Sequence, residues 1–221
     1  MIDFYGYDFA SVLARRGHMA LAPDIRGFGE RREAAEQGED RILSSSCRAI
    51  AHMALPLGLN LMGLLVWDLM RLVDYCVGEG WVDIHMIGFS GGGMQTLYAC
   101  ALDERIRSAF ISGYYYGFLD SLLVMNANCD CNYVPGLWLH FEVSDLAAMI
   151  APRPIVIQSA ENDHLAGPRG LGNVRCYVEE LRGAYALMAK ESNLCHDVIE
   201  GGHHFGLSSM VDDYHRVGLE V

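Results

Sequence analysis

The sequence predicts an α/β fold in which a mainly parallel β-sheet is flanked by helices. Short apolar runs of strand length alternate with segments whose apolar residues recur at helical spacing, which is typical of such sheets. One run leads directly into a glycine cluster, as expected at a tight strand-to-helix turn. The 221 residues are 52% hydrophobic and contain no repeat or linker, so we expect one domain over residues 1–221 with a substantial core.

The N-terminal quarter is predicted to contain one helix and one strand. Residues 7–16 have the apolar spacing of a short amphipathic helix, and Gly17 stands where helices commonly end. The apolar run 18–23 has strand length. The polar, glycine-containing stretch 24–47 predicts a long surface excursion, and the apolar periodicity of residues 61–77 predicts the next helix.

The centre of the chain is predicted to form a strand, a helix and a second strand. Residues 83–89 are an apolar strand that ends at the glycine cluster, residues 94–102 a helix, and residues 106–112 a strand. Residues 113–137 are rich in aromatics and lack periodicity, which predicts irregular structure.

The C-terminal part repeats the alternation. Residues 145–150 predict one or two helical turns, residues 154–159 a buried strand, and residues 171–189 a helix. Residues 197–200 predict a last short strand, which ends at the Gly-Gly-His-His run 201–204.

Composition disfavours several classes of function. The formal net charge of −12 repels nucleic acids and anionic membrane surfaces. Seven scattered cysteines are unlike a secreted disulfide scaffold and fit a reducing compartment. The chain carries no signal-peptide pattern, and its most apolar stretch, residues 53–67, is broken and too short to span a bilayer. We therefore expect a cytoplasmic protein with no nucleic-acid or membrane partner.

The sequence Gly-Phe-Ser-Gly-Gly over residues 88–92 indicates a catalytic serine. It matches the pattern G-x-S-x-G and stands between a predicted strand and a predicted helix, the context that gives this pattern meaning. Such a turn exposes the Ser90 hydroxyl at a helix N-terminus, where free amides and the helix dipole favour an anion. The amide of Gly91 is then an oxyanion donor, and Phe89 lies beside the substrate.

A serine nucleophile needs a base, and the base needs an orienting acid. In this arrangement the acid and the histidine follow the serine in chain order, each after a later strand. Asp163 and His203 occupy those places, with Glu161 and Asp145 as alternatives for the acid. His204 is the alternative base.

Other side chains give weaker signals. Tyr114 follows a predicted strand where a substrate pocket would open, although aromatic packing is the simpler interpretation. Cys129 and Cys131 lack the spacing of a typical metal or redox pair, so we expect ordinary loop residues. No metal or cofactor is predicted.

Four segments resemble the α/β-hydrolase superfamily, and within it the dienelactone-hydrolase and acetyl-xylan-esterase-like branch. They are residues 22–29, 88–92, 151–154 and 201–203, and the resemblance extends over nearly the whole chain. It implies an α/β-hydrolase fold with Ser90 as nucleophile, Asp163 as acid and His203 as base.

The same resemblance adds an expectation for Arg26 and Gly27. In the family, the residues at these positions brace loops near the active site, so Arg26 is a candidate substrate-binding residue, although an ordinary turn explains it equally well.

The resemblance also reveals a departure. Family members generally begin with two or three more strands and a His-Gly loop that supplies a second oxyanion amide, whereas this chain starts at what looks like the first helix. We therefore expect an N-terminally truncated version of the fold. Losing one oxyanion donor costs about 10²–10³ in turnover, and an open sheet edge invites a homo-oligomer.

Together these observations predict a serine hydrolase that cleaves a small carboxylic ester through an acyl-enzyme, without a cofactor. The alternatives are a peptidase of the same fold and a non-catalytic hydrolase-like module that binds a partner.

Overall fold

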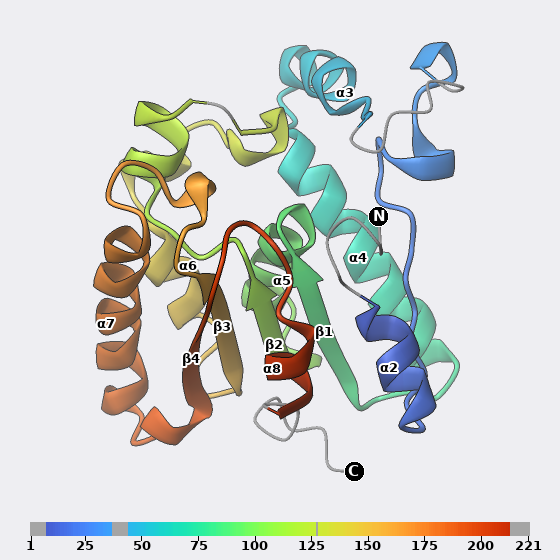
Figure 1. The fold of residues 1–221 in the computed structure, drawn as a ribbon. Coiled ribbons are helices and arrows are strands. Elements are labelled where there is room, and N and C mark those ends of the chain that lie inside the picture. The colour runs from blue at the N-terminus through green and yellow to red at the C-terminus, as the bar shows by residue number, and fades with distance from the viewer. Residues whose placement is uncertain (1–7, 37–43, 127, 213–221) are drawn as a thin grey trace.

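The computed structural model describes residues 8–36, 44–126 and 128–212. Its sheet has four strands, all parallel, in the order β1-β2-β3-β4 (Figure 1). The strands are β1 Ile84–Phe89, β2 Ile106–Ser112, β3 Ile155–Ala160 and β4 Leu194–Ile199. The α-helices are α2 Phe9–Arg15, α3 Cys47–Ala54, α4 Leu61–Gly78, α5 Gly91–Leu102, α6 Val143–Ala148, α7 Leu171–Leu187 and α8 Leu207–Asp212.

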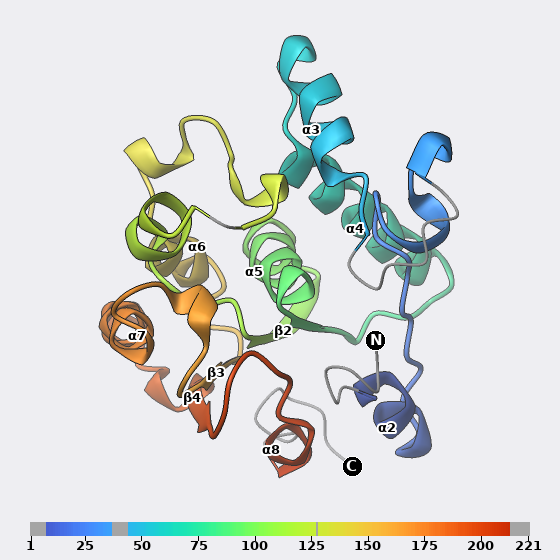
Figure 2. The same ribbon diagram turned by 45° about the horizontal axis from the view of Figure 1, so that its top comes forward.

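Helices cover both faces of the sheet, as the sequence predicts. Helices α4, α5, α6 and α7 contribute to one large core cluster. Helices α2 and α8 pack on the other face, where Phe9, Phe89 and Phe205 belong to a second, smaller cluster (Figure 2). Every residue of β3 is buried, which explains its apolar sequence, since a parallel strand inside such a sandwich contacts helices on both sides.

The register brings the carboxyl ends of the strands together. Phe89 at the end of β1 pairs with Ser112 at the end of β2, and Ser112 pairs with Gln158 of β3. Ligands of open parallel sheets bind outside these ends. The loops that leave β1, β3 and β4 therefore open on the same edge of the sheet.

Most predicted elements are present, with shifts of a few residues at their ends. Helix α5 begins at Gly91 rather than Met94, because the glycine cluster itself forms the first helical turn. The described part of the excursion 24–47 contains two short 3₁₀ turns, Gly29–Arg31 and Ala34–Glu36. Residues 37–43 of this excursion lie outside the described residues.

The strand predicted over residues 18–23 is wrong. The structure assigns no strand there, and Met19 and Leu21 are 64% and 46% exposed. A strand needs a neighbouring backbone to complete its hydrogen bonds, and none of the described strands pairs with this run. Among the described residues β1 likewise pairs only with β2, so oligomerisation through this edge stays a prediction.

Helix α3 was not predicted, although its sequence contains the signal. Its buried residues Cys47, Ile50, Ala51 and Ala54 follow the spacing i, i+3, i+4, i+7 of one helical face. This apolar pattern covers only eight residues and directly follows a polar excursion. From sequence alone it is therefore difficult to distinguish the helix from a continuation of the loop.

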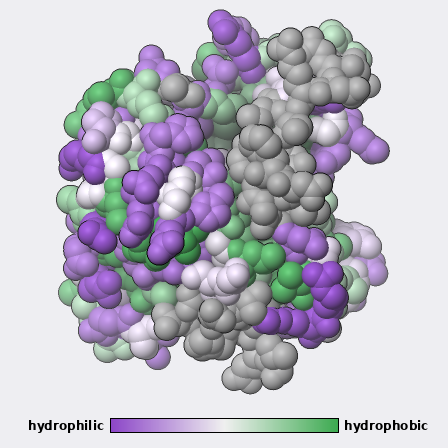
Figure 3. All heavy atoms as spheres, viewed as in Figure 1, coloured by the Kyte–Doolittle hydropathy of each residue, from purple (hydrophilic) through white to green (hydrophobic). Residues whose placement is uncertain are grey.

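Buried hydrophobic residues form the core, and other hydrophobic residues remain exposed at the surface. Hydrophilic residues cover much of the face seen in Figure 3, with smaller hydrophobic areas between them. Among the described helices, none alone has the length and apolar composition needed to cross a bilayer. Only the pair Cys47–Leu57 and Leu61–Gly78, which is bent by 100°, meets these two criteria when both parts are taken together.

We expect His196 to make the fold less stable in acid. Burial, aided by the positive charge of Arg175, lowers the pKa of His196 to about 4, whereas an unfolded histidine titrates near 6.5. Between these values the unfolded chain binds a proton that the folded chain does not, so the free energy of unfolding falls as the pH falls. This proton uptake by the unfolded chain lowers the free energy of unfolding at pH 4.5 by about 2 kcal/mol relative to pH 7.

Urea unfolding at pH 7 and pH 4.5 measures this effect. The stability lost by His196→Gln between the two pH values should be smaller than the loss of the wild type, whereas exposed His52, changed to Gln, should leave the loss unchanged. Equal losses in wild type and His196→Gln would contradict the prediction.

Candidate active site

Ser90 occupies the sharp turn between β1 and α5. Its backbone has φ 56° and ψ −119°, a strained conformation for a residue with a side chain, and its N–H donates to the Ser112 carbonyl at 2.8 Å. A Cβ at Gly88 would collide with the Gly92 carbonyl, and one at Gly93 would lie 2.7 Å from the Ser112 oxygen. The closeness of these backbones therefore requires glycine at positions 88 and 93.

Ser90, His203 and Asp163 form a continuous hydrogen-bonded relay. The Ser90 hydroxyl lies 2.8 Å from His203 Nε2, and His203 Nδ1 lies 2.7 Å from Asp163 Oδ2. Because a carboxylate only accepts, Nδ1–H donates to Asp163 and Nε2 accepts from Ser90. The side chains of His203 and Asp163 are 8% and 7% exposed, which keeps water from competing for the bond between them.

Asp163 is held by the turn that follows β3. Its second oxygen, Oδ1, accepts from the backbone N–H of Leu165 at 2.9 Å, so both carboxylate oxygens have a donor. The loop backbone is also tied to the loop after β4, because Asn162 N–H donates to the Gly201 carbonyl at 2.9 Å. Gly201 has φ +92°, a conformation that glycine adopts without strain.

A buried glutamine connects the strands beneath the relay. Gln158 of β3 accepts from Ser112 Oγ at 2.8 Å and from Gly206 N–H at 2.9 Å, and its amide nitrogen donates to Asp197 Oδ2 at 2.9 Å. It thereby links β2, β4 and the segment after His203. The sequence signal is a large polar side chain, Gln158, in a strand that is apolar apart from it and Ser159.

Aromatic rings fix the His203 imidazole from two sides. The Phe89 ring lies 4.7 Å from it, and the His164 ring lies 5.9 Å away at a steep angle. A Cβ at Gly113 would lie 2.8 Å from the Phe89 ring and 3.1 Å from His203 Cε1. Phe89 was predicted to contact substrate; the structure places its ring against the histidine.

The alternatives left open by the sequence lie elsewhere. Glu161 is exposed, and Asp145 accepts from the Glu142 N–H at 2.8 Å at the start of α6. His204 Nδ1–H donates to the Gly202 carbonyl at 2.8 Å. Of all the acids and bases that the sequence offers as candidates, the structure joins Asp163 and His203 to Ser90.

Arg26 is not part of this relay. Its guanidinium donates twice to Asp68 of α4, from Nε at 2.9 Å and from the second nitrogen at 2.7 Å, and these bonds raise the pKa of Arg26. Arg26 and Asp68 line a cavity of about 330 Å³ between α4 and the segment 23–31, and none of the three relay residues lines it. A role for Arg26 in substrate binding stays a prediction.

Tyr114 belongs to the core. It is 3% exposed, its ring lies 5.1 Å from that of Tyr116, and its buried hydroxyl has no hydrogen-bond partner among the described residues. Burial raises the pKa of Tyr114 well above its usual range. The structure thus places Tyr114 in aromatic packing, the simpler of the two interpretations.

The geometry provides the components of acyl transfer. His203 is placed to accept the Ser90 proton, and Asp163 to stabilise the imidazolium that forms. Gly91 begins α5 directly after Ser90, where the first N–H groups of a helix lack intrahelical partners. These amides and the helix dipole favour negative charge beside the Ser90 oxygen.

Comparison with known proteins agrees with this fold. No family model matches the sequence. The chain is 30% identical over 186 residues to a Bacillus subtilis (strain 168) protein named "Putative hydrolase YtaP", covering 80% of this chain and 56% of that protein. The chain thus spans about half the length of this relative.

Solved structures give the same class of fold. A structure described as "a putative acetyl xylan esterase" from Bacteroides fragilis NCTC 9343 matches with a TM-score of 0.68 and 18% identity, covering 94% of this chain and 56% of that one. The glucuronoyl esterase of Solibacter usitatus matches with a TM-score of 0.57 and 18% identity, over 72% of this chain and 48% of that one.

These findings define the class: the chain has an α/β-hydrolase fold. Within that class it is similar in sequence to a hydrolase and similar in structure to esterases.

Proposed function

We propose that this protein is a serine hydrolase that cleaves a small carboxylic ester. The observation that supports this most strongly is the His203 imidazole, which is hydrogen-bonded on one side to Ser90 and on the other to Asp163. The names of the similar proteins, hydrolase and acetyl xylan esterase, favour hydrolysis of an acetyl ester.

The proposed reaction follows from the relay. Ser90 Oγ attacks the ester carbonyl carbon while His203 Nε2 takes the hydroxyl proton. The carbonyl oxygen becomes negative and accepts a hydrogen bond from the Gly91 N–H. When the tetrahedral intermediate collapses, His203 returns the proton to the departing alcohol, leaving an acyl group on Ser90. Water, deprotonated by the same imidazole, then attacks the acyl carbon, and His203 returns the proton to Ser90 Oγ as the carboxylic acid leaves.

Substrate comparison tests the class of reaction. The purified chain should hydrolyse p-nitrophenyl acetate well above a buffer blank, and amino-acid p-nitroanilides much more slowly. Faster cleavage of the anilides would indicate a peptidase instead. A folded protein that cleaves neither substrate would contradict the proposal and favour a non-catalytic binding module.

Asp163 should be essential, and its neighbour in the same loop should not. Asp163→Asn removes the charge that stabilises the imidazolium and favours the wrong tautomer of His203, so we expect kcat for p-nitrophenyl acetate to fall by about 10⁴-fold. Glu161→Gln, at an exposed position two residues earlier, is the matched control and should change kcat less than about twofold. A large loss in Glu161→Gln with near-normal Asp163→Asn would reassign the acid.

A further inference from the structure

Three cysteines from two distant parts of the chain meet above the sheet. Cys47 is the first residue of α3, Cys129 precedes the 3₁₀ turn Asp130–Asn132, and Cys131 lies within that turn. Their three sulfur atoms all lie within 4.8 Å of one another. Among the described residues the group comprises these three alone, and the reaction proposed above uses none of them.

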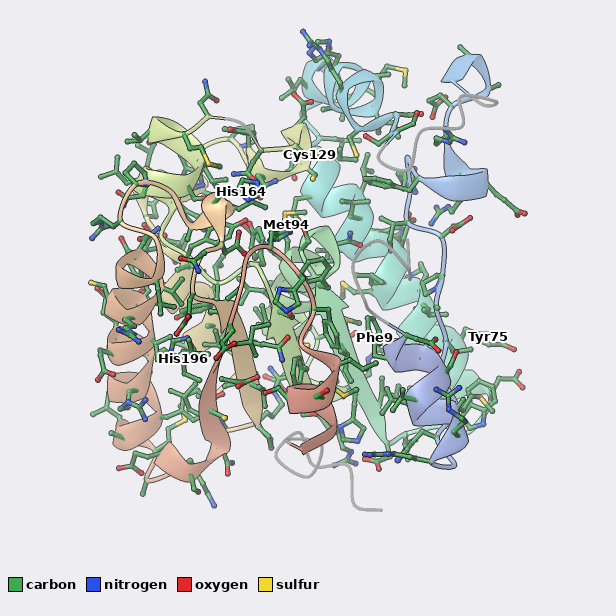
Figure 4. The ribbon with its side chains drawn as sticks, in the orientation of Figure 1. Phe9, Tyr75, Met94, Cys129, His164 and His196 are labelled. Carbon is green, nitrogen blue, oxygen red and sulfur yellow. The ribbon has the colours of Figure 1, made fainter. Side chains whose placement is uncertain are left out.

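The group is enclosed but accessible from one side. Cys47 and Cys131 are buried, and Cys129 is half-buried. Cys129 marks the place in Figure 4 where the 128–134 loop approaches the start of α3. A small solute can therefore reach the sulfurs through Cys129, while the other two are shielded from bulk solvent.

A buried amide next to the group has an unusual environment. Asn132 is 5% exposed, and its side-chain nitrogen donates to Cys131 Sγ at 3.8 Å and to the Cys129 carbonyl at 3.0 Å. Its side-chain oxygen is buried without a hydrogen-bond partner among the described residues. An N–H that donates to sulfur stabilises a thiolate, as the groups around metal-bound ligands do.

We propose that Cys47, Cys129 and Cys131 together bind one thiophilic metal ion of the zinc class. Zinc–sulfur bonds of about 2.3 Å in tetrahedral geometry separate the sulfurs by about 3.8 Å, a distance compatible with the observed spacing. Each thiol releases its remaining proton to solvent as it binds. A disulfide would join only two of the sulfurs and leave the third unused, whereas a metal ion employs all three.

Such an ion would join the start of helix α3 to an irregular loop. Helix α3 follows the surface excursion, and the 128–134 loop belongs to the long connection between β2 and β3. Residues of α3 pack against the turn Asp130–Asn132, so the ion would join them at the point where they already touch. The site is structural in this proposal, and its test does not depend on esterase activity.

Zinc titration of the reduced, metal-free protein tests the proposal. Competition with a chromophoric zinc indicator should show one tightly bound equivalent per chain, and cobalt(II) should give a thiolate-to-cobalt charge-transfer band in the near ultraviolet. Cys129→Ser should weaken zinc binding at least about tenfold and lower the intensity of the band, since one of three thiolates is lost. Cys176→Ser, at an exposed cysteine outside the group, is the matched control and should bind like the wild type.

A second measurement uses the wild type alone and decides the matter if Cys129→Ser does not fold. Zinc should slow alkylation of Cys129 at least about tenfold, mapped by mass spectrometry, and leave exposed Cys176 unaffected. Alkylation of Cys129 at the same rate with and without zinc would overturn the proposal. So would zinc binding that Cys129→Ser retains in full, or an intramolecular disulfide among the three cysteines in protein purified without reductant.

Discussion

Replacing Ser90 with alanine should lower kcat for p-nitrophenyl acetate by about 10⁴- to 10⁶-fold, the range expected when a triad nucleophile is removed. The reason is that the alanine side chain has no oxygen to form the acyl-enzyme, while the backbone amides at the start of α5 remain. The residual rate should approach what those groups supply without covalent catalysis. Background-corrected kinetics at saturating substrate measure the change.

The matched control for Ser90→Ala is the replacement of another serine that belongs to the same sheet. Ser159 of β3 is buried. Its hydroxyl oxygen lies 3.3 Å from Nε2 of His196, which is not a member of the relay. Ser159→Ala should retain kcat within a few-fold, and circular dichroism should show both variants folded. Equal turnover by wild type and Ser90→Ala would end the proposal of a serine esterase.

Replacing His203 with alanine should have an effect of similar size, about 10⁴- to 10⁶-fold in kcat. Without the imidazole, no described group stands within hydrogen-bonding distance of Ser90 Oγ to accept its proton. Background-corrected kinetics with p-nitrophenyl acetate measure the loss, and circular dichroism shows whether the variant is folded.

His204→Ala separates the two adjacent histidines. In the described part of the chain, the His204 side chain is hydrogen-bonded to the backbone carbonyl of Gly202, which belongs to the same loop. Its removal should leave kcat within about threefold of the wild type. If His204→Ala proved inactive and His203→Ala active, the base would be misassigned.

The order of strands and helices could be predicted because it depends on local patterns. The strand prediction for residues 106–112 matches β2, Ile106–Ser112, at both ends, since buried parallel strands are continuous apolar runs. The run 18–23 has a similar composition and forms no strand. Whether an apolar run becomes a strand depends on a partner distant in sequence, which local composition does not encode.

The three relay residues could be named from the sequence because their places follow from topology. Ser90 stands in a motif, and Asp163 and His203 follow the ends of strands that a parallel sheet brings to one edge. The choice between His203 and His204 depends on the path of the loop, including the φ of +92° at Gly201, which only the folded chain displays.

The cysteine group shows the opposite case. Cys129 and Cys131 were noticed as a pair of unsuitable spacing, and Cys47 was not connected with them. Their association needs α3, which was not predicted, to lie against the turn Asp130–Asn132. A three-residue site formed between segments so distant in the chain leaves no spacing signature.

The most direct test of the relay is labelling with a fluorophosphonate, followed by intact-mass and peptide mass spectrometry. Such reagents react with a serine only when a neighbouring base activates it. We expect one phosphonyl group per chain, mapped to Ser90, and no adduct in Ser90→Ala or His203→Ala. A folded wild type that remains unmodified, or one that carries its label on another residue, would contradict the account.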